Sequence, residues 1–313
     1  MNEDKAARVS ILVHNRNRGD CLARCLESIA TQRARPLEVV LLDAESTDDS
    51  PAIVARQTKA LEALGIDVVF QSCAPAGVPR SRNLAASLAT GSLLFFMDND
   101  ATLVGPDVVE QLRQGFSQEP ALGLVGCQIR AGDENGADPF CWVYRRPVSP
   151  WFNKPFDTFT FAGAGFCIRA KAYHACGGFW EVIEYAREEE ALALRLLDQG
   201  WRVRYLPRAA VRHYPDPRGR RNPIERRVVE LKNGVLIYWH SYPRGAGLLF
   251  SLLRVVSMSL RTVLRREGSI VTLLSGWRAA RQCWREQQLR AEPVRWGTFF
   301  RLLSLHIPKG HAE

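Results

Sequence analysis

The amino-acid sequence predicts an α/β protein in which a mostly parallel sheet is flanked by helices. Two observations lead to this fold class. Short apolar segments of strand length alternate with stretches whose apolar residues recur at helical spacing, which is the pattern of right-handed βαβ units. The chain can also bury a large core, since 46% of its 313 residues are hydrophobic and only 24% are charged.

The first hundred residues hold the clearest alternation. Apolar runs predict four strands, at Val9–Val13, Leu37–Asp43, Asp67–Gln71 and Ser92–Met97. The helices expected between them run from Asp20 to about Gln32, from a cap at Thr47–Asp49 to about Leu64, and from Arg80 to Ala89. Parallel sheets of this kind bind ligands beyond the carboxyl ends of their strands. Asp43 and Asp98 fall at such ends, so they are candidate site residues.

The second hundred residues are harder to interpret. Residues 101–160 are predicted to be less regular, because Gly, Pro and Asp interrupt the pattern from 131 to 157. The elements expected after them are an apolar segment Phe159–Ile168, a helix Tyr185–Gln199 and a strand Arg202–Leu206. From about residue 234 the chain is predicted to be helical and basic.

An acidic motif, Asp98–Asp100 (DND), follows the fourth predicted strand. Two carboxylates separated by one residue can offer hard oxygen ligands to one divalent cation, and Mg²⁺ or Mn²⁺ would bridge them to a diphosphate. Such a cation stabilises charge on a leaving nucleoside diphosphate. The motif is short, and an Asp/Asn turn after a strand is the alternative interpretation.

Several segments, taken in order, resemble the family 2 inverting glycosyltransferases. The matching segments are Val13–Arg16, Cys25–Ile29, Val40–Asp48, Arg82–Leu84, Gly91 and Asp98–Asp100. Each segment is degenerate alone, and their order and spacing together carry the resemblance, which covers roughly residues 8–240. The resemblance implies the GT-A fold, a Rossmann-like and mostly parallel sheet flanked by helices.

The resemblance also implies a nucleotide-sugar site in the first hundred residues. Asp43 would accept a hydrogen bond from the N3–H of uracil or thymine, although a helix-cap or turn role is the alternative for this carboxylate. Arg82 would lie beside the diphosphate, where a guanidinium pairs well with phosphate oxygens. The other donor-side residues would be His14, Asn15 and Arg16 as a wall of the base pocket, Asp98 near ribose or metal, and Asp100 on the metal.

An acidic pair matches the place where this family carries its general base. In the family the pair stands seven residues before an arginine, and matching that arginine to Arg195 selects Glu188 and Glu189. The resemblance implies that Glu189, with Glu188 as second choice, removes the proton of the acceptor hydroxyl. The alternative is an acidic first helical turn that complements the helix macrodipole.

Two further segments resemble parts of the family's site. Glycine in the acceptor-side segment would allow close approach of a sugar, with a tight turn or sheet crossing as the alternative; the matching residues are Gly163, Ala164 and Gly165. His213 would complete the metal or diphosphate site, although a lone histidine is often structural. Arg218, Arg220 and Arg221 could close over the diphosphate or simply form a solvated loop.

The charge of the chain is unevenly distributed, since residues 1–200 carry a net charge of −6 and residues 201–313 one of +15. We expect a GT-A domain over residues 1–235, with a nucleotide-binding half at about 8–100 and an acceptor half at about 101–235, and a basic amphipathic helical extension over 236–313. Arg254, Arg261 and Arg265 would share one helix face. Basic amphipathic helices suit an anionic membrane surface, and packing on the catalytic domain is the alternative.

The chain offers no apolar run long enough to span a membrane, and its first residues are polar. We therefore expect a cytoplasmic protein, peripheral on the inner face of the membrane. Eight dispersed cysteines without a C-x-x-C pattern are interpreted as reduced thiols rather than a zinc site.

The predicted function is transfer of a sugar from a UDP- or dTDP-sugar to a saccharide or lipid-linked acceptor, with inversion and with Mg²⁺ or Mn²⁺ as cofactor, as in polysaccharide biosynthesis. A nicotinamide-dependent Rossmann protein is disfavoured, because Asn15–Gly19 stands where G-x-G-x-x-G belongs. The alternatives left open are a catalytically inactive nucleotide-sugar-binding protein and a nucleic-acid-binding protein. No nucleic-acid recognition motif supports the latter, and no nucleic-acid partner is expected.

Overall fold

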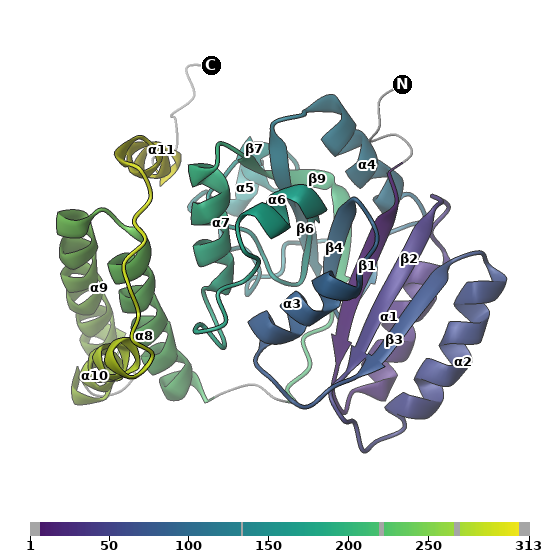
Figure 1. Ribbon diagram of the computed structural model, residues 1–313, viewed down its shortest axis with the longest axis horizontal. Coiled ribbons are helices and arrows are strands. Elements are labelled where there is room, and N and C mark those ends of the chain that lie inside the picture. The colour runs from purple at the N-terminus through teal and green to yellow at the C-terminus, as the bar shows by residue number, and fades with distance from the viewer. Residues whose placement is uncertain (1–6, 133, 219–221, 266–269, 307–313) are drawn as a thin grey trace.

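The structure is a computed structural model that describes residues 7–132, 134–218, 222–265 and 270–306. One twisted sheet lies at its centre with helices on both faces, and the C-terminal helices gather beside α7 (Figure 1). The strands are β1 (Val9–Asn15), β2 (Leu37–Asp43), β3 (Asp67–Ser72), β4 (Leu93–Asp98), β5 (Ala101–Leu103), β6 (Leu122–Ala131), β7 (Phe156–Asp157), β8 (Gly165–Arg169) and β9 (Arg202–His213). The helices are α1 (Gly19–Ala30), α2 (Ser50–Ala63), α3 (Val78–Leu88), α4 (Val108–Gln118), α5 (Val148–Trp151), α6 (Ala170–Ala175), α7 (Glu188–Asp198), α8 (Pro223–Ser241), α9 (Arg244–Arg265), α10 (Ile270–Glu286) and α11 (Trp296–His306).

The sheet is mixed and mostly parallel. Its strand order is β3-β2-β1-β4-β8-β6-β9-β5, and β7 pairs with β9 at the side of this path. Strands β1 to β4, β6 and β9 run in one direction, whereas β5, β7 and β8 run in the opposite one. The expected fold class, a mostly parallel sheet flanked by helices, is therefore confirmed.

The apolar strands bury side chains on both faces of the sheet. In β1, Leu12 packs into the core beneath α3, α6 and α7, whereas Ile11 and Val13 pack into the core beneath α1, α2 and α4. Because successive side chains of a strand point to opposite faces, a strand covered on both sides is apolar throughout. This explains why apolar runs located β1, β2 and β4 correctly, whereas β3 lies at the edge of the sheet and is only partly buried.

The prediction that residues 101–160 are less regular was wrong over their first part, which forms β5, α4 and β6. Strand β6 contains two glycines that need a structural explanation. A Cβ added at Gly123 would lie 2.7 Å from the Cβ of Trp201, and one at Gly126 would lie 3.0 Å from the Tyr144 hydroxyl. These glycines therefore make room for aromatic side chains within a strand and do not mark turns.

Several predicted element ends differ from those observed. Arg18, not Asp20, occupies the N-cap of α1, and Asp20 lies in its first turn. Helix α7 begins at Glu188 rather than Tyr185, because Ala186 and Arg187 take the left-handed conformation, with φ of 64° and 70°. Strand β9 continues to His213, well past the expected end at Leu206.

The segment Thr47–Asp49 caps α2 as expected, with the N-cap position and the capping side chain on different residues. Asp49 is the N-cap residue of α2, but its side chain makes no capping hydrogen bond. Instead, Oδ1 of Asp48 accepts a hydrogen bond from the backbone N–H of Ser50 at 3.0 Å. The carboxylate one residue earlier thus satisfies a free N–H of the first helical turn.

The C-terminal helices begin earlier than residue 234. Helix α8 starts at Pro223, and Oδ1 of Asn222 caps it by accepting a hydrogen bond from Ile224 N at 2.9 Å. The boundary expected after residue 235 therefore falls inside α8, and the division of the chain into domains stays a prediction.

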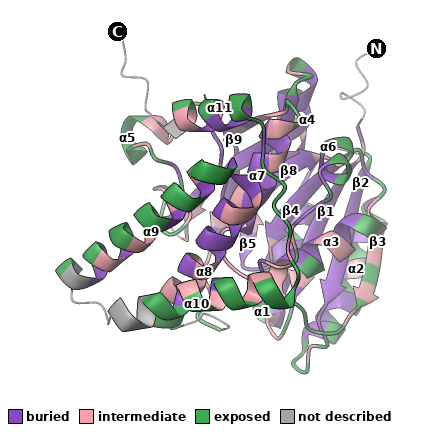
Figure 2. Cartoon of the chain, turned by 60° about the vertical axis from the view of Figure 1, so that its left-hand side comes forward, coloured by how far each residue is buried: buried purple, intermediate pink, exposed green. Residues whose placement is uncertain are grey.

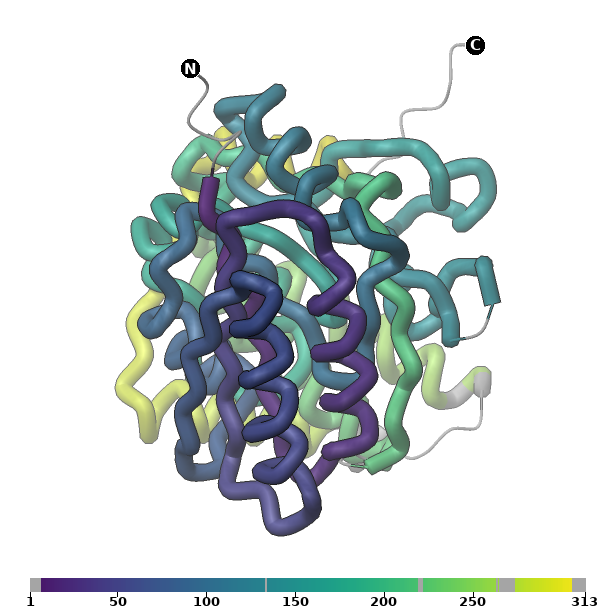
Figure 3. Tube along the Cα trace, turned by 90° about the vertical axis from the view of Figure 1, so that its right-hand side faces the viewer, coloured from purple at the N-terminus to yellow at the C-terminus, as the bar shows by residue number. Residues whose placement is uncertain are grey.

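In the described part of the chain, no helix combines the length and apolarity needed to cross a membrane. Figure 3 shows the N-terminal units nearest the viewer and the C-terminal helices behind them.

Candidate active site

The carboxyl ends of β1, β2 and β4 lie side by side. The parallel register pairs Asn15 with Asp43 and His14 with Asp98. Side chains that are far apart in the sequence are thereby brought to one edge of the sheet, where α/β proteins bind ligands.

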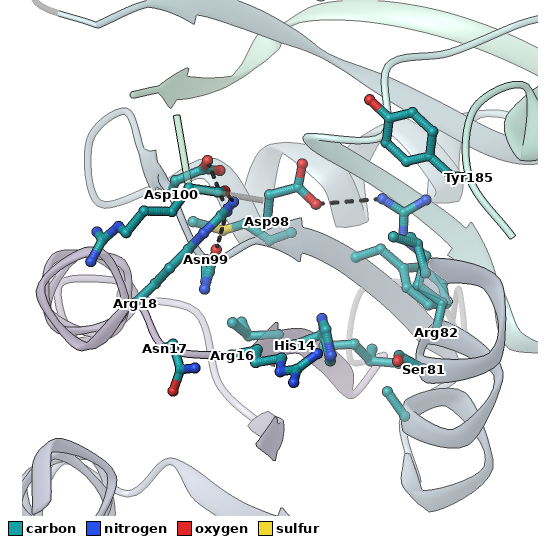
Figure 4. Close-up of a pocket in the computed structure, with 17 residues that line it drawn as sticks. His14, Arg16, Asn17, Arg18, Ser81, Arg82, Asp98, Asn99, Asp100 and Tyr185 are labelled. Atoms are coloured by element: carbon teal, nitrogen blue, oxygen red, sulfur yellow. Dashed lines mark hydrogen bonds and ion pairs between the residues drawn. The ribbon is translucent and has the colours of Figure 1, made fainter. Parts of the chain in front are cut away.

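A cavity of about 650 Å³ opens at this edge (Figure 4). Five of the residues predicted for the site line it, namely His14, Arg16, Arg82, Asp98 and Asp100. The described residues that line the cavity do not include the other predicted residues, which are Asn15, Asp43, Gly163, Ala164, Gly165, Glu188, Glu189 and His213. The cavity lining thus combines two carboxylates with four arginines, two of which pair with those carboxylates.

Asp98, Asp100 and His213 come together as a candidate metal-ligand set. One ligand atom from each lies within 4.8 Å of the others. The short strand β5 explains this meeting, because it follows Asp100 directly and pairs with the end of β9, placing Ala101 opposite His213. Nε2 of His213 consequently lies 3.5 Å from Oδ1 of Asp100.

The second ring nitrogen of His213 is bound on the opposite side. Nδ1 lies 2.7 Å from Oδ2 of the buried residue Asp138, and Sγ of Cys141 lies 3.7 Å from the same nitrogen. Burial lowers the pKa of His213, but hydrogen bonds to Asp100 and Cys141 outweigh burial and raise this pKa to about 11. His213 therefore carries a proton between carboxylates, at a place that a divalent cation could take.

Arg82 connects the two acidic groups of the site. Its Nη2 atom lies 3.4 Å from Oδ1 of Asp98, a contact visible in Figure 4, and donates a hydrogen bond to the carbonyl of Gly163 at 3.0 Å. Its Nη1 atom lies 3.4 Å from Oε1 of Glu188 and 3.7 Å from Oε1 of Glu189. A buried cation among three carboxylates is well paired and is held in one orientation.

The acidic pair lies in the first turn of α7. The Glu188 side chain is 6% exposed and that of Glu189 is 18% exposed. Burial raises the pKa of both carboxyl groups, and the negative charge of Glu188 raises that of Glu189 further. The pair therefore holds protons at a higher pH than ordinary glutamates do.

The Gly163–Gly165 segment supports this pair rather than lining the cavity. A Cβ added at Gly163 would clash with Oε1 of Glu189 and lie 2.9 Å from Nη2 of Arg82. Gly165 lies in β8 and packs against Val211, so a side chain there would enter the sheet core. The glycine at 163 is thus required by the close approach of the acidic pair and Arg82.

Asn15 and Asp43 form a buried network beside the cavity. Nδ2 of Asn15 donates to Oδ1 of Asp43 at 3.0 Å, and Ser46 donates its backbone N–H and its hydroxyl to the same carboxylate at 2.9 and 2.7 Å. Oδ1 of Asn15 in turn accepts from Asn99 at 2.7 Å. Both oxygens of Asp43 are therefore engaged by the protein in this structure.

His14 lines the cavity in its neutral form. Burial and the charge of Arg82 lower its pKa to about 4. Its Nε2 atom is buried and has no hydrogen-bond partner among the described residues. Because buried polar atoms are nearly always paired, this nitrogen is suited to a ligand.

Some residues at the site were not predicted from the sequence. Arg18 lies 3.4 Å from Oδ2 of Asp100, and Tyr185 lines the cavity above Arg82 (Figure 4). Arg18 could have been predicted as a site residue, because it belongs to the run Asn15–Gly19 between a predicted strand and a predicted helix. No local sequence pattern indicated a role for Asp138. Arg218, for which a solvated loop was the alternative, lines the cavity and also pairs with Asp20 and Asp216. Arg220 and Arg221 lie outside the described residues.

The sequence profile described as Glycosyl transferase family 2 matches residues 10–177, which is more than half of the chain. Among curated relatives, the O-antigen biosynthesis protein RfbC of Myxococcus xanthus is 28% identical over 214 residues. That alignment covers 63% of this chain and 16% of RfbC. The chain likewise spans less than two thirds of the length of the other first relatives it matches.

Two solved structures resemble the fold of this chain over most of its length. S. aureus TarS 1–349 in complex with UDP-GlcNAc aligns with a TM-score of 0.63 at 16% identity, covering 88% of this chain and 81% of that one. Mannosyltransferase PcManGT from Pyrobaculum calidifontis, in complex with GDP-Man and Mn²⁺, aligns with a TM-score of 0.56 at 16% identity, covering 96% and 84%. At this identity the likeness shows the fold. The profile match shows that the chain belongs to glycosyl transferase family 2, and the likeness to the solved structures shows that it has the GT-A fold.

Proposed function

We propose that this protein transfers a sugar from a UDP- or dTDP-sugar to a hydroxyl group of a saccharide or lipid-linked glycan, with inversion at the anomeric carbon and with Mg²⁺ or Mn²⁺ bound. The observation that carries the proposal is the position of Arg82. It lies between a candidate metal-ligand set and a buried acidic pair, at one cavity. An inverting transferase needs these parts together: a cation, a diphosphate partner and a base.

Asp98, Asp100 and His213 would hold the cation. Two carboxylates and an imidazole suit Mn²⁺, and the carboxylates also suit Mg²⁺. The cation supplies charge neutralisation for the diphosphate that leaves. The Mn²⁺ named in the PcManGT complex supports a metal in this fold without selecting between the two ions.

The donor would occupy the cavity along β1. His14 and Arg16 would form a wall of the base pocket, and Nε2 of His14 has a free hydrogen-bonding position for it. A contact between Asp43 and the base stays a prediction. Oδ2 of Asp43 accepts one hydrogen bond from Ser46 N and retains a lone pair that can accept a second. TarS was solved with UDP-GlcNAc and PcManGT with GDP-Man, so these structural neighbours differ in the base they bind.

The bond-making step would use Glu189. Its carboxylate would take the proton of the acceptor hydroxyl, and that oxygen would form a bond to the anomeric carbon. The bond between the anomeric carbon and the diphosphate oxygen would break, and its electron pair would leave with the nucleoside diphosphate. The greater exposure of Glu189 supports it over Glu188, whereas the unpaired buried Oε2 of Glu188 keeps that residue as second candidate among the described residues.

The acceptor is inferred from chemistry and from one relative. A base that activates a hydroxyl suits a saccharide, and the name of RfbC places that protein in O-antigen biosynthesis. We therefore propose a role in polysaccharide biosynthesis, with the sugar and linkage left to experiment.

A panel of nucleotide sugars tests this proposal. Release of nucleoside diphosphate would be measured for UDP-, dTDP- and GDP-sugars, with Mn²⁺, with Mg²⁺ and with a chelator. We expect release from a UDP- or dTDP-sugar that depends on the metal. Metal-independent release, or turnover of GDP-sugars alone, would contradict the proposal.

A further inference from the structure

Helix α9 exposes a continuous apolar stripe. Seven aliphatic side chains on this helix are between 50% and 73% exposed; they are Leu248, Leu249, Leu252, Leu253, Val256, Leu260 and Leu264. Most are spaced by four residues, which places them on one side of the helix over about 24 Å. Figure 2 shows exposed residues along the outer side of α9. Contiguous exposed apolar surface on a folded protein usually marks a place of interaction.

The opposite face of α9 already packs against the protein. Ser251 and Met258 are buried, and the ring of Phe250 lies 5.3 Å from that of Tyr242 and 5.8 Å from that of Phe299 of α11. Packing against the protein, one of the two alternatives for the C-terminal helices, therefore occurs on the inner face of α9. The inner face joins the core, and the outer apolar face remains without a protein neighbour among the described residues.

A basic pocket opens at one end of the stripe. It has a volume of about 400 Å³ and lies between α8, α9 and α10. Arg244, Arg281 and Arg285 line it, together with Trp239, Trp284 and Leu248. Leu248 belongs to both the pocket and the stripe, so the two features are continuous. Among the described residues, no acidic one lines the pocket, and its guanidinium groups suit phosphate oxygens.

The charge pattern selects the occupant. Helix α9 contains four arginines and no acidic residue. Any pairing of two copies through α9 would bring like charges together, because Arg244 lies at one end of the stripe and Arg261 near the other, and like charges across an interface are costly. A lipid surface with anionic headgroups instead matches an apolar stripe with a cationic rim, and tryptophan suits the boundary between headgroups and hydrocarbon.

We propose that the α9 stripe inserts its aliphatic side chains into an anionic lipid surface and that the pocket between α8, α9 and α10 takes a lipid phosphate headgroup. The pocket is also linked to the active site. Tyr238 lines the pocket, and its hydroxyl accepts a hydrogen bond of 3.1 Å from Arg187, the residue before Glu188. If the proposed function holds, a lipid-linked acceptor would reach the acidic pair from the surface that α9 binds.

Vesicle binding by the full chain tests this proposal without any need for turnover. We expect the protein to sediment with phosphatidylglycerol-containing vesicles about tenfold or more tightly than with pure phosphatidylcholine vesicles, because anionic headgroups add an electrostatic attraction. Binding should persist in an excess of inorganic phosphate, since the stripe adds apolar contact that free phosphate lacks. Loss of binding in phosphate would show a site for the free anion and overturn the lipid assignment.

Matched variants separate the stripe and the pocket from general surface effects. Leu252→Glu combined with Val256→Glu, and Arg281→Ala combined with Arg285→Ala, should each weaken vesicle binding about tenfold or more. Leu64→Glu, at a leucine equally exposed beside α2, and Arg56→Ala combined with Lys59→Ala on α2, should bind as the parent does. Equal binding by all four variants would overturn the proposal.

A dimer in light scattering that the Leu252 and Val256 double variant converts to a monomer would instead assign the stripe to a second copy. Nucleoside diphosphate release by these variants should match the parent, so failure of lipid binding and failure of the proposed transfer are separate results.

Discussion

Nδ1 of His213 lies 2.7 Å from Oδ2 of the buried residue Asp138, and this contact directs the other ring nitrogen, Nε2, toward Asp100. Asp138 is itself held in place, because its Oδ1 atom accepts backbone N–H groups from Phe140 and Cys141. A carboxylate bound to one ring nitrogen determines which nitrogen is free for a metal. Asp138 is therefore expected to position His213 without touching the substrate.

Replacing Asp138 with Asn keeps the shape of the side chain and removes its charge. We expect Mn²⁺ to bind the variant roughly 10- to 100-fold more weakly, which is the usual cost of losing such a supporting residue. The Mn²⁺ dissociation constant from electron paramagnetic resonance would measure this effect independently of turnover. Asp107→Asn, at an exposed carboxylate, is the control. A folded Asp138→Asn protein with the parent's Mn²⁺ affinity would remove the positioning role.

Asp100→Asn should have a larger effect than Asp138→Asn. Asp100 is 8% exposed and faces both His213 and Arg18, so its loss removes a proposed ligand and the partner of two cations. We expect metal-dependent kcat/KM to fall by about 100-fold or more. Donor turnover as a function of Mn²⁺ concentration would show this fall. Parent-like metal dependence in the variant would exclude Asp100 as a ligand.

Glu189→Gln should bind the donor and lose transfer. The variant keeps the size of the side chain but cannot take a proton, and loss of a general base costs roughly 10²- to 10⁴-fold in rate. Donor affinity from calorimetry and transfer rate from product formation would separate the two effects. An unchanged transfer rate would exclude Glu189 as the base.

The pH dependence of transfer should depend on Glu188. Burial and the charge of Glu188 raise the pKa of Glu189, and the base must be deprotonated, so the rate should rise with pH through a pKa above that of an ordinary glutamate. Glu188→Gln removes the neighbouring negative charge, lowers the pKa of Glu189 and should shift this rise to lower pH. Profiles of kcat/KM against pH would show the shift. If Glu188→Gln instead abolishes transfer at every pH, Glu188 is the base.

Gly163→Ala tests how closely the acidic pair must approach Arg82. The added methyl group would clash with Glu189 and press on Arg82, so both side chains must move. We expect kcat to fall by about 10- to 100-fold, because small displacements of catalytic groups are costly. Gly136→Ala is the control, since a Cβ at that glycine meets nothing within 4 Å. Equal rates for the two variants would show that the pair tolerates displacement.

Much of the nucleotide-binding half could be predicted because its signals are local. The runs at Val9–Val13 and Leu37–Asp43 are mostly apolar, as strands buried on both faces usually are, and β1 and β2 confirm them. Strand β6, which contains Gly123 and Gly126, was not predicted from the sequence. Only the positions of Trp201 and Tyr144 in space show why glycine stands there.

The sequence by itself determined the mostly parallel sheet and the place of Asp98–Asp100 beyond a strand end, since both follow from the spacing of apolar residues along a short stretch of chain. Only the tertiary structure decided that His213 meets Asp100, through the pairing of β5 with β9, and that Asp138 supports it. It also decided which face of α9 is covered and which is open to a partner. Contacts between distant segments depend on how the elements pack, and the local pattern of a sequence records only that a face is apolar, not what will cover it.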